Sequence, residues 1–137
     1  MNEPITGGCG CGAVRFEITE PLLSAGYCHC TRCQRRSGTA ASANARAEPG
    51  SVRIVQGEHE LRAWAPTGGF EKLFCSLCGS ALFSRLPGTT DYTGVRLGAI
   101  DGDPGIRPQS HTFVAYAAVW EPLPDDGLPR FPESRPA

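Results

Sequence analysis

Cysteine spacing is the feature that most constrains what this chain can fold into. Its seven cysteines fall into three blocks, GGCGCG, YCHCTRC and FCSLCG, each with glycine or polar turn-forming residues nearby. Grouped thiols of this kind are typical of metal sites, because sulfurs from one turn can converge on one ion. The middle block is unusual, since it holds three cysteines and no fourth follows to complete a tetrahedral shell.

Two other uses of cysteine fit this pattern less well. The count is odd, and Cys9 with Cys11, or Cys28 with Cys30, stand too close in sequence for comfortable disulfides. Buried thiols that act as small hydrophobic residues would be scattered instead of grouped. Thiolate sulfur suits zinc or an iron–sulfur cluster, and the spacing does not resemble iron–sulfur cysteine sets. We therefore expect zinc.

The first and last blocks each supply half of a metal site. Cys75 and Cys78 have the two-residue spacing that turns both sulfurs toward one ion, and Gly79 permits the positive φ that such a turn often needs. Cys9 and Cys11 lie on one face of an extended segment, because side chains alternate along a strand. The two pairs together predict a closed four-thiolate zinc site that stabilises the fold.

The middle block then offers three ligands for a second zinc: Cys28, Cys30 and Cys33. Three protein ligands and one exchangeable position describe a catalytic zinc site. The alternative is a second structural site, closed by His29, His59, His111 or an acidic side chain. His29 is the weak candidate among these, because it stands between two ligands and an extended segment would direct its ring to the opposite face.

Composition and charge exclude several kinds of partner. The net charge is -1 and the pI about 6.3, so no general nucleic-acid partner is expected. The start, MNEPITGGCG, lacks the features of a secretory signal, and the apolar run FVAYAAVW is far shorter than a membrane span. We expect a cytoplasmic protein with no membrane partner, and 137 residues predict one domain over residues 1–137.

The remaining pattern predicts an all-β fold. Short alternating or β-rich runs occur at AVRFEI, SVRIV, ELRAW, ALFSRL, VRLGAI and HTFVAYAAVW, separated by turn-forming residues. Helix is expected only near residues 32–37 and 103–106. The proline-rich tail, about residues 121–137, is expected to lie extended on the surface, held by Leu123, Leu128 and Phe131.

The segments GGCGCGAVRFEI, YCHCTRCQRRSG, FCSLCGSALFSR and SHTFVAYAAVWEPLPDDGLPRFPE resemble, in order and spacing, the glutathione-dependent formaldehyde-activating enzyme family, also called Gfa-like or CENP-V/GFA. The resemblance covers nearly the whole chain. It implies an Mss4-like fold of several small coiled antiparallel β-sheets stapled by zinc. It also implies a structural zinc on Cys9, Cys11, Cys75 and Cys78, and a second zinc on Cys28, Cys30 and Cys33.

The same resemblance implies a reaction. Family members are expected to join formaldehyde to the thiol of glutathione, forming S-hydroxymethylglutathione, or to run the reverse carbon–sulfur lyase reaction. Zinc would either lower the pKa of the thiol or polarise the aldehyde oxygen. The alternative is a non-catalytic, zinc-stabilised module that binds a partner or a small thiol. A fourth protein ligand on the second zinc would favour that module.

Basic and polar residues beside the middle block are candidate substrate contacts. Arg32, Gln34 and Arg35 flank the cysteines, with Arg36 next to them, and guanidinium groups match the carboxylates of glutathione. A solvated basic turn, or a set of charges that only balances the thiolates, would explain the same residues. Many relatives read lysine or arginine, alanine, proline, tryptophan before the tail, whereas residues 116–120 here read YAAVW and lack that charge and proline.

Overall fold

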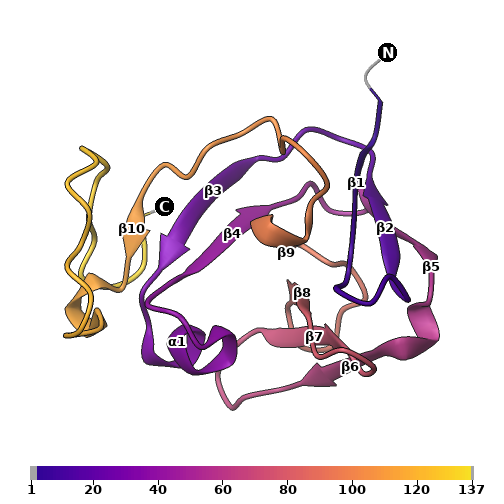
Figure 1. Ribbon diagram of the computed structural model, residues 1–137, viewed down its shortest axis with the longest axis horizontal. Coiled ribbons are helices and arrows are strands. Elements are labelled where there is room, and N and C mark those ends of the chain that lie inside the picture. The colour runs from indigo at the N-terminus through magenta and orange to yellow at the C-terminus, as the bar shows by residue number, and fades with distance from the viewer. Residues whose placement is uncertain (1–2, 137) are drawn as a thin grey trace.

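The computed structural model of the chain describes residues 3–136, which fold mainly into β-strands (Figure 1). A three-stranded antiparallel sheet has the order β1-β2-β5. Its strands span Ile5–Gly8, Arg15–Ile18 and Val52–Gln56. Phe16 and Ile18 are buried on one face of β2, as the alternation in AVRFEI predicts.

The larger sheet has seven strands in the order β10-β3-β4-β9-β8-β7-β6. These strands span His111–Thr112, Ser24–Cys28, Ser42–Arg46, Gly94–Arg96, Ala81–Arg85, Glu71–Cys75 and Leu61–Trp64, in the order of the sheet. All neighbours are antiparallel except β10 and β3, which run parallel. Figure 1 shows β3 and β4 in the upper part of the view and β6–β8 in the lower part, so the sheet is strongly curved.

The helices in residues 3–136 are short. The α-helix α1 spans Thr31–Ser37, and single 3-10 turns span Glu58–Glu60 (η1), Leu97–Ala99 (η2) and Val114–Tyr116 (η3). None of the helices in this range is long and apolar enough to cross a bilayer.

The two faces of the seven-stranded sheet differ in chemistry. Cross-strand partners share a face, so the register places one row of apolar side chains together in the core. This row consists of Ala25, Ala45, Val95, Phe83 and Leu73, all buried. The opposite face carries a polar row of Cys28, Ser42, Asn44, Arg96, Gly94, Ser84 and Lys72. The polar face is therefore free to form a site.

The all-β prediction is confirmed, and four of the six predicted runs contain three or more strand residues. The run VRLGAI holds only Val95 and Arg96 of β9, because the 3-10 turn η2 follows at Leu97–Ala99. The sixth, HTFVAYAAVW, was wrong beyond its first two residues, because Phe113 adopts a left-handed φ of 57° that ends the strand and starts η3. Helix at 103–106 was also wrong. Asp103 accepts a hydrogen bond from the backbone N–H of Gly105, whose φ of 79° is incompatible with a right-handed helix.

The proline-rich tail lies against β10 and η3, at the left of Figure 1. Phe131 N–H donates to the carbonyl of His111 at 2.8 Å, and His111 N–H donates to the carbonyl of Pro129 at 2.9 Å. The side chains of Leu123, Leu128 and Phe131 are each partly buried. The tail is therefore fixed by backbone hydrogen bonds as well as by the apolar contacts expected from sequence.

Candidate functional site

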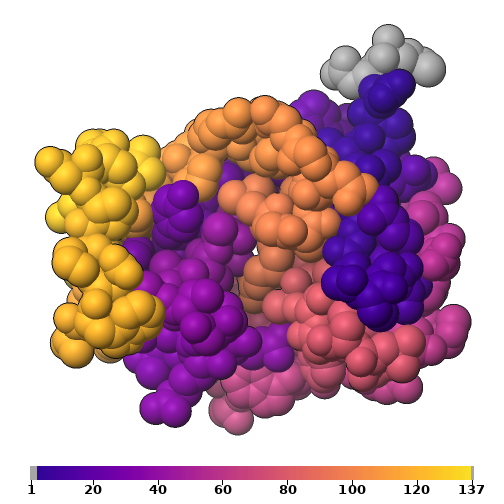
Figure 2. All heavy atoms as spheres, viewed as in Figure 1, coloured from indigo at the N-terminus to yellow at the C-terminus, as the bar shows by residue number. Residues whose placement is uncertain are grey.

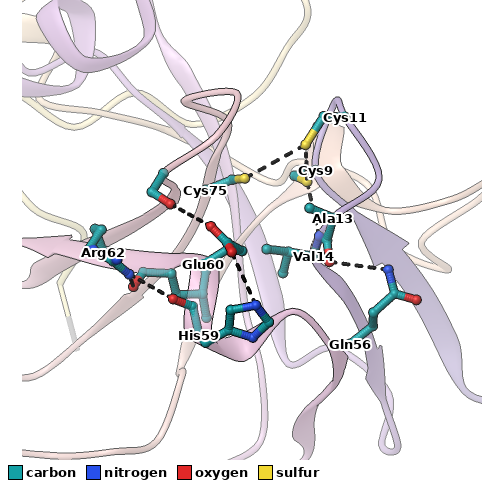
Figure 3. A network of polar contacts seen from close by, with 11 residues as sticks. Cys9, Cys11, Ala13, Val14, Gln56, His59, Glu60, Arg62 and Cys75 are labelled. Atoms are coloured by element: carbon teal, nitrogen blue, oxygen red, sulfur yellow. Dashed lines mark hydrogen bonds and ion pairs between the residues drawn. The ribbon is translucent and has the colours of Figure 1, made fainter.

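The first and last cysteine blocks come together in one cluster of four sulfurs. The ligand atoms of Cys9, Cys11, Cys75 and Cys78 all lie within 4.8 Å of one another. The Sγ of Cys11 is 3.6 Å from that of Cys9 and 4.0 Å from that of Cys75. Figure 3 shows these three side chains directed toward one another.

Backbone turns shape this cluster. The N–H of Val14 donates to the Sγ of Cys9 at 3.2 Å, at the turn that precedes β2. On the other side, Gly79 has a φ of 77°, and its N–H donates to the carbonyl of Cys75 at 2.8 Å. The Gly79 conformation is the one that the FCSLCG motif predicts, because glycine adopts positive φ without a steric penalty.

The geometry fits zinc. Four sulfurs at about 2.3 Å from one zinc would lie roughly 3.8 Å apart, and the two measured separations, 3.6 and 4.0 Å, bracket that value. Hydrogen bonds from Ser80 are the main cause that lowers the pKa of Cys78 to about 5. A thiolate is therefore available at neutral pH to begin metal binding.

The middle block forms the second cluster. The sulfurs of Cys28, Cys30 and Cys33 lie within 4.8 Å of one another. Cys28 ends β3, Cys30 is the N-cap of α1, and Cys33 lies in the first helical turn. The Sγ of Cys30 accepts a hydrogen bond of 3.2 Å from the N–H of Cys33, so one tight turn holds these two sulfurs together.

Within residues 3–136, no histidine, aspartate or glutamate joins this second cluster. The Nε2 of His29 lies 2.9 Å from the Nδ1 of His111, away from the sulfurs. The Nε2 of His111 lies 2.8 Å from a carboxylate oxygen of Asp126. His59 is exposed and lies beside Glu60, near the four-sulfur cluster (Figure 3). The second cluster therefore presents three protein ligands, the donor set of an open zinc site.

The three thiols differ in acidity. The hydrogen bond from Cys28, with help from Ser42 and Cys30, lowers the pKa of Cys33 to about 5. The same hydrogen bond to Cys33, followed by burial, raises the pKa of Cys28 well above its ordinary value. The Cys33 thiolate thus forms easily, and its negative charge opposes ionisation of the neighbouring thiols, because like charges repel. A divalent cation is what would allow all three to ionise together.

A cavity of about 830 Å³ opens beside this cluster and is lined by Cys28, Cys30 and Cys33. The polar face of the seven-stranded sheet forms much of its wall. In Figure 2 the surface is hollowed near the centre of the view, between purple and orange segments. Gly94 leaves room in the wall, since a Cβ there would lie 2.0 Å from the Oγ of Ser84.

The residues expected to contact substrate lie in different places. Arg32 is exposed and lines the cavity. Gln34 does not line it, and its Nε2 donates to the carbonyls of His29 at 2.8 Å and Tyr116 at 2.9 Å. Arg35 is exposed on the helix and is absent from the cavity wall. Of the three, the structure brings only Arg32 to the cavity.

Sequence reasoning missed the cations that lie nearest the second cluster. Lys72 and Arg96 project from β7 and β9 into the cavity wall, and both are partly buried. Arg36, which the sequence did place beside the cysteines, does not line the cavity and lies over the rings of Trp64 and Phe74, 5.8 and 5.5 Å from their centroids. Strand alternation could have placed Lys72 and Arg96. Their sequence neighbours Leu73 and Val95 are apolar and face the core, so Lys72 and Arg96 lie on the opposite face.

Comparison with known proteins gives consistent matches. A family model described as glutathione-dependent formaldehyde-activating enzyme matches residues 4–116. A Halomonas elongata protein named "Putative glutathione-dependent formaldehyde-activating enzyme" is 31% identical over 123 residues, which cover 85% of this chain and 78% of that protein. The crystal structure of a Rhodobacter sphaeroides protein is similar, with a TM-score of 0.55 and 30% identity over 72% of this chain and 89% of the other.

Proposed function

Because the chain belongs to the glutathione-dependent formaldehyde-activating enzyme family, we propose that it is a zinc-dependent carbon–sulfur lyase that forms and splits the adduct of glutathione and formaldehyde. The observation that carries this proposal is the three-sulfur cluster, which lies at a cavity and has no fourth ligand from residues 3–136. We also propose that the enzyme is cytoplasmic and that residues 1–137 act as one domain.

The reaction is an addition that needs no oxidant or reductant. The sulfur of glutathione bonds to the carbonyl carbon of formaldehyde, and the thiol proton ends on the carbonyl oxygen, giving S-hydroxymethylglutathione. The reverse reaction breaks the same carbon–sulfur bond. Zinc bound by Cys28, Cys30 and Cys33 would supply acidity to a thiol or polarise a carbonyl oxygen.

The chain's own residues have separate roles in this proposal. Cys28, Cys30 and Cys33 would hold the second zinc at the cavity. Residues 28–33 carry these cysteines and are called the metal loop. Gln34 fixes the end of this loop, because its Nε2 donates to one backbone carbonyl before α1 and to another in η3. The four-sulfur cluster would hold the structural zinc, with one cysteine pair beside β2 and the other beside β7.

Cobalt substitution tests the proposed site directly. Glutathione should change the cobalt spectrum through thiolate ligation, and Cys30→Ser should lose the second metal and the adduct reaction while the fold stays nearly intact. Released cobalt must be measured in parallel, because glutathione can also strip the metal.

A variant outside the metal loop supplies the control. Arg53→Gln removes an exposed charge of β5 that pairs with Glu17 and should leave metal content and reaction unchanged. The proposal fails if adding glutathione leaves the spectrum of the cobalt-loaded protein unchanged. That result would favour the zinc-stabilised binding module.

A further inference from the structure

The cavity beside the three-sulfur cluster is strongly basic. Five cationic side chains line it: Arg32, Arg46, Lys72, Arg96 and Arg135. No aspartate or glutamate from residues 3–136 joins the lining. The ion pairs found in this part of the chain use other basic side chains than these five. The cavity therefore holds excess positive charge.

Lys72 and Arg96 are the two of these cations that are partly buried, whereas the other three are exposed. Burial lowers the pKa of Lys72, and the nearby charge of Arg96 lowers it further. Burial likewise lowers the pKa of Arg96, with the thiolate of Cys33 acting in the opposite direction. Two like charges in a partly dry wall repel each other, and a bound anion would relieve that repulsion.

Hydrogen bonds hold Arg96 in place and connect it to the metal loop. Its Nη1 donates to the Oδ1 of Asn44, its cross-strand partner, and the Nδ2 of Asn44 donates to the Oγ of Ser42 at 2.9 Å. A hydrogen bond from Ser42 in turn helps to lower the pKa of Cys33. The guanidinium is thus preorganised beside the sulfurs, with a fixed orientation.

Balancing the thiolates does not account for all this charge. Zinc and three thiolates together leave one negative charge. The negative charge of the Cys33 thiolate acts to raise the pKa of three cations: Arg36, Lys72 and Arg96. Arg36 lies over the rings of Trp64 and Phe74 and does not line the cavity. Lys72 and Arg96 remain with charge to offer a ligand.

We propose that Lys72 and Arg96 form a carboxylate-binding subsite, which holds an anionic end of the thiol substrate beside the Cys28, Cys30 and Cys33 cluster. This inference rests on the proposed function and names the residues that select an anionic thiol. Arg96 offers the planar fork that matches a carboxylate, and Lys72 offers a point charge on a neighbouring part of the wall. An uncharged thiol of the same size would gain neither contact.

The test uses S-methylglutathione, which keeps both carboxylates and has no free thiol, and its diethyl ester. Calorimetric titration of the zinc-loaded protein should show at least about tenfold tighter binding of the carboxylate form, because only that form gains charge-assisted hydrogen bonds from Lys72 and Arg96. Arg96→Gln and Lys72→Gln should each remove most of that ratio and leave ester binding unchanged.

Arg46→Gln is the matched control, because Arg46 is an exposed cation on the same cavity wall. Arg46→Gln should bind the carboxylate form and the ester with the same affinity ratio as the unchanged protein. Zinc content and the circular dichroism spectrum establish that each variant is folded. Should Arg96→Gln misfold, Lys72→Gln decides alone, with Lys72→Arg expected to restore carboxylate binding.

Three patterns of binding would overturn the subsite. They are equal binding of acid and ester, a ratio that survives in both subsite variants, and a ratio that Arg46→Gln lowers as much as they do. Absence of measurable binding by either probe would overturn it as well. Neither probe can ligate cobalt through a thiolate. The probe titration can therefore fail while the glutathione–cobalt titration of the proposed function succeeds, or succeed while that titration fails.

Discussion

Gly57 shows how one residue supports the four-sulfur cluster. It follows β5 with a φ of 77°, and a Cβ at this position would lie 2.0 Å from the carbonyl oxygen of Ala13. The Nε2 of Gln56 donates to that same carbonyl at 3.2 Å (Figure 3). The turn that carries the first cysteine pair therefore packs directly on the end of β5.

Gly57→Ala should destabilise the zinc-loaded protein by about 2–5 kcal/mol. The left-handed conformation costs about 1–2 kcal/mol with a Cβ, and displacing the neighbouring backbone costs about 1–3 kcal/mol more. Gly50→Ala is the control, since Gly50 has a φ of 81° with nothing within 4 Å of its Cβ position. Urea unfolding should show the smaller loss for Gly50→Ala; equal losses would contradict the packing argument.

The grouping of the cysteines was predictable from the sequence because spacing is a local property. A two-residue gap between cysteines brings two sulfurs together within one turn, whatever the rest of the fold does. The cations of the proposed subsite were not predictable in this way. Lys72 and Arg96 meet only because β7, β8 and β9 pair in one register, and no spacing in the sequence encodes that pairing.

At the scale of elements, the predicted runs left out β1, β3, β4 and β7, and two of these strands share a composition. The segments SAGYC and SANAR form β3 and β4 without the β-branched residues that usually mark a strand. Gly26 packs closely on its neighbour, since a Cβ there would lie 3.1 Å from the Oγ of Ser110, and Ala45 is buried in the core. Tertiary packing, not local preference, makes these segments extended.

The tail is joined to the metal loop by a chain of three side chains. A carboxylate only accepts, so the Nε2–H of His111 donates to Asp126, and the Nδ1 of His111 lies 2.9 Å from the Nε2 of His29. His111 is 1% exposed and His29 6%. The hydrogen bond from His111 lowers the pKa of Asp126, so its carboxylate is ionised at neutral pH.

Asp126→Ala should loosen the tail at pH 7. Hydrogen exchange at the amides of Phe131 and His111 should accelerate at least severalfold, because these amides close the tail onto β10. Asp125→Ala is the matched control, since Asp125 is the neighbouring exposed carboxylate. Unchanged exchange in Asp126→Ala would show that the backbone contacts hold the tail without the histidine chain.

At the scale of the whole molecule, the four-sulfur cluster joins the two sheets. Cys9 and Cys11 follow β1 of the smaller sheet, and Cys75 ends β7 of the larger one. Cys75 is fully buried, and the separation of Cys11 and Cys75 in sequence is 64 residues. A metal at this point would therefore link parts of the chain that local structure cannot hold together.

Cys75→Ser should lower the free energy of unfolding by several kcal/mol or prevent folding, because binding of a structural zinc is part of the folding free energy. Cys30→Ser is the matched comparison, with one thiol removed from the other cluster and a much smaller loss expected. Denaturant unfolding with a zinc count checks both. A stable, fully zinc-loaded Cys75→Ser protein would disprove the assignment of this cluster.

The distance in sequence between the two cysteine pairs also sets the order of events during synthesis. At about 5–20 residues per second, Cys11 waits roughly 3–13 s on the ribosome before Cys75, 64 residues later, is added. The edge of β3 remains unpaired for longer still, since its partner strand β10 begins at His111. Nascent chains therefore carry open thiols for seconds, so yield in the cell should depend on free zinc and on a reducing environment during translation.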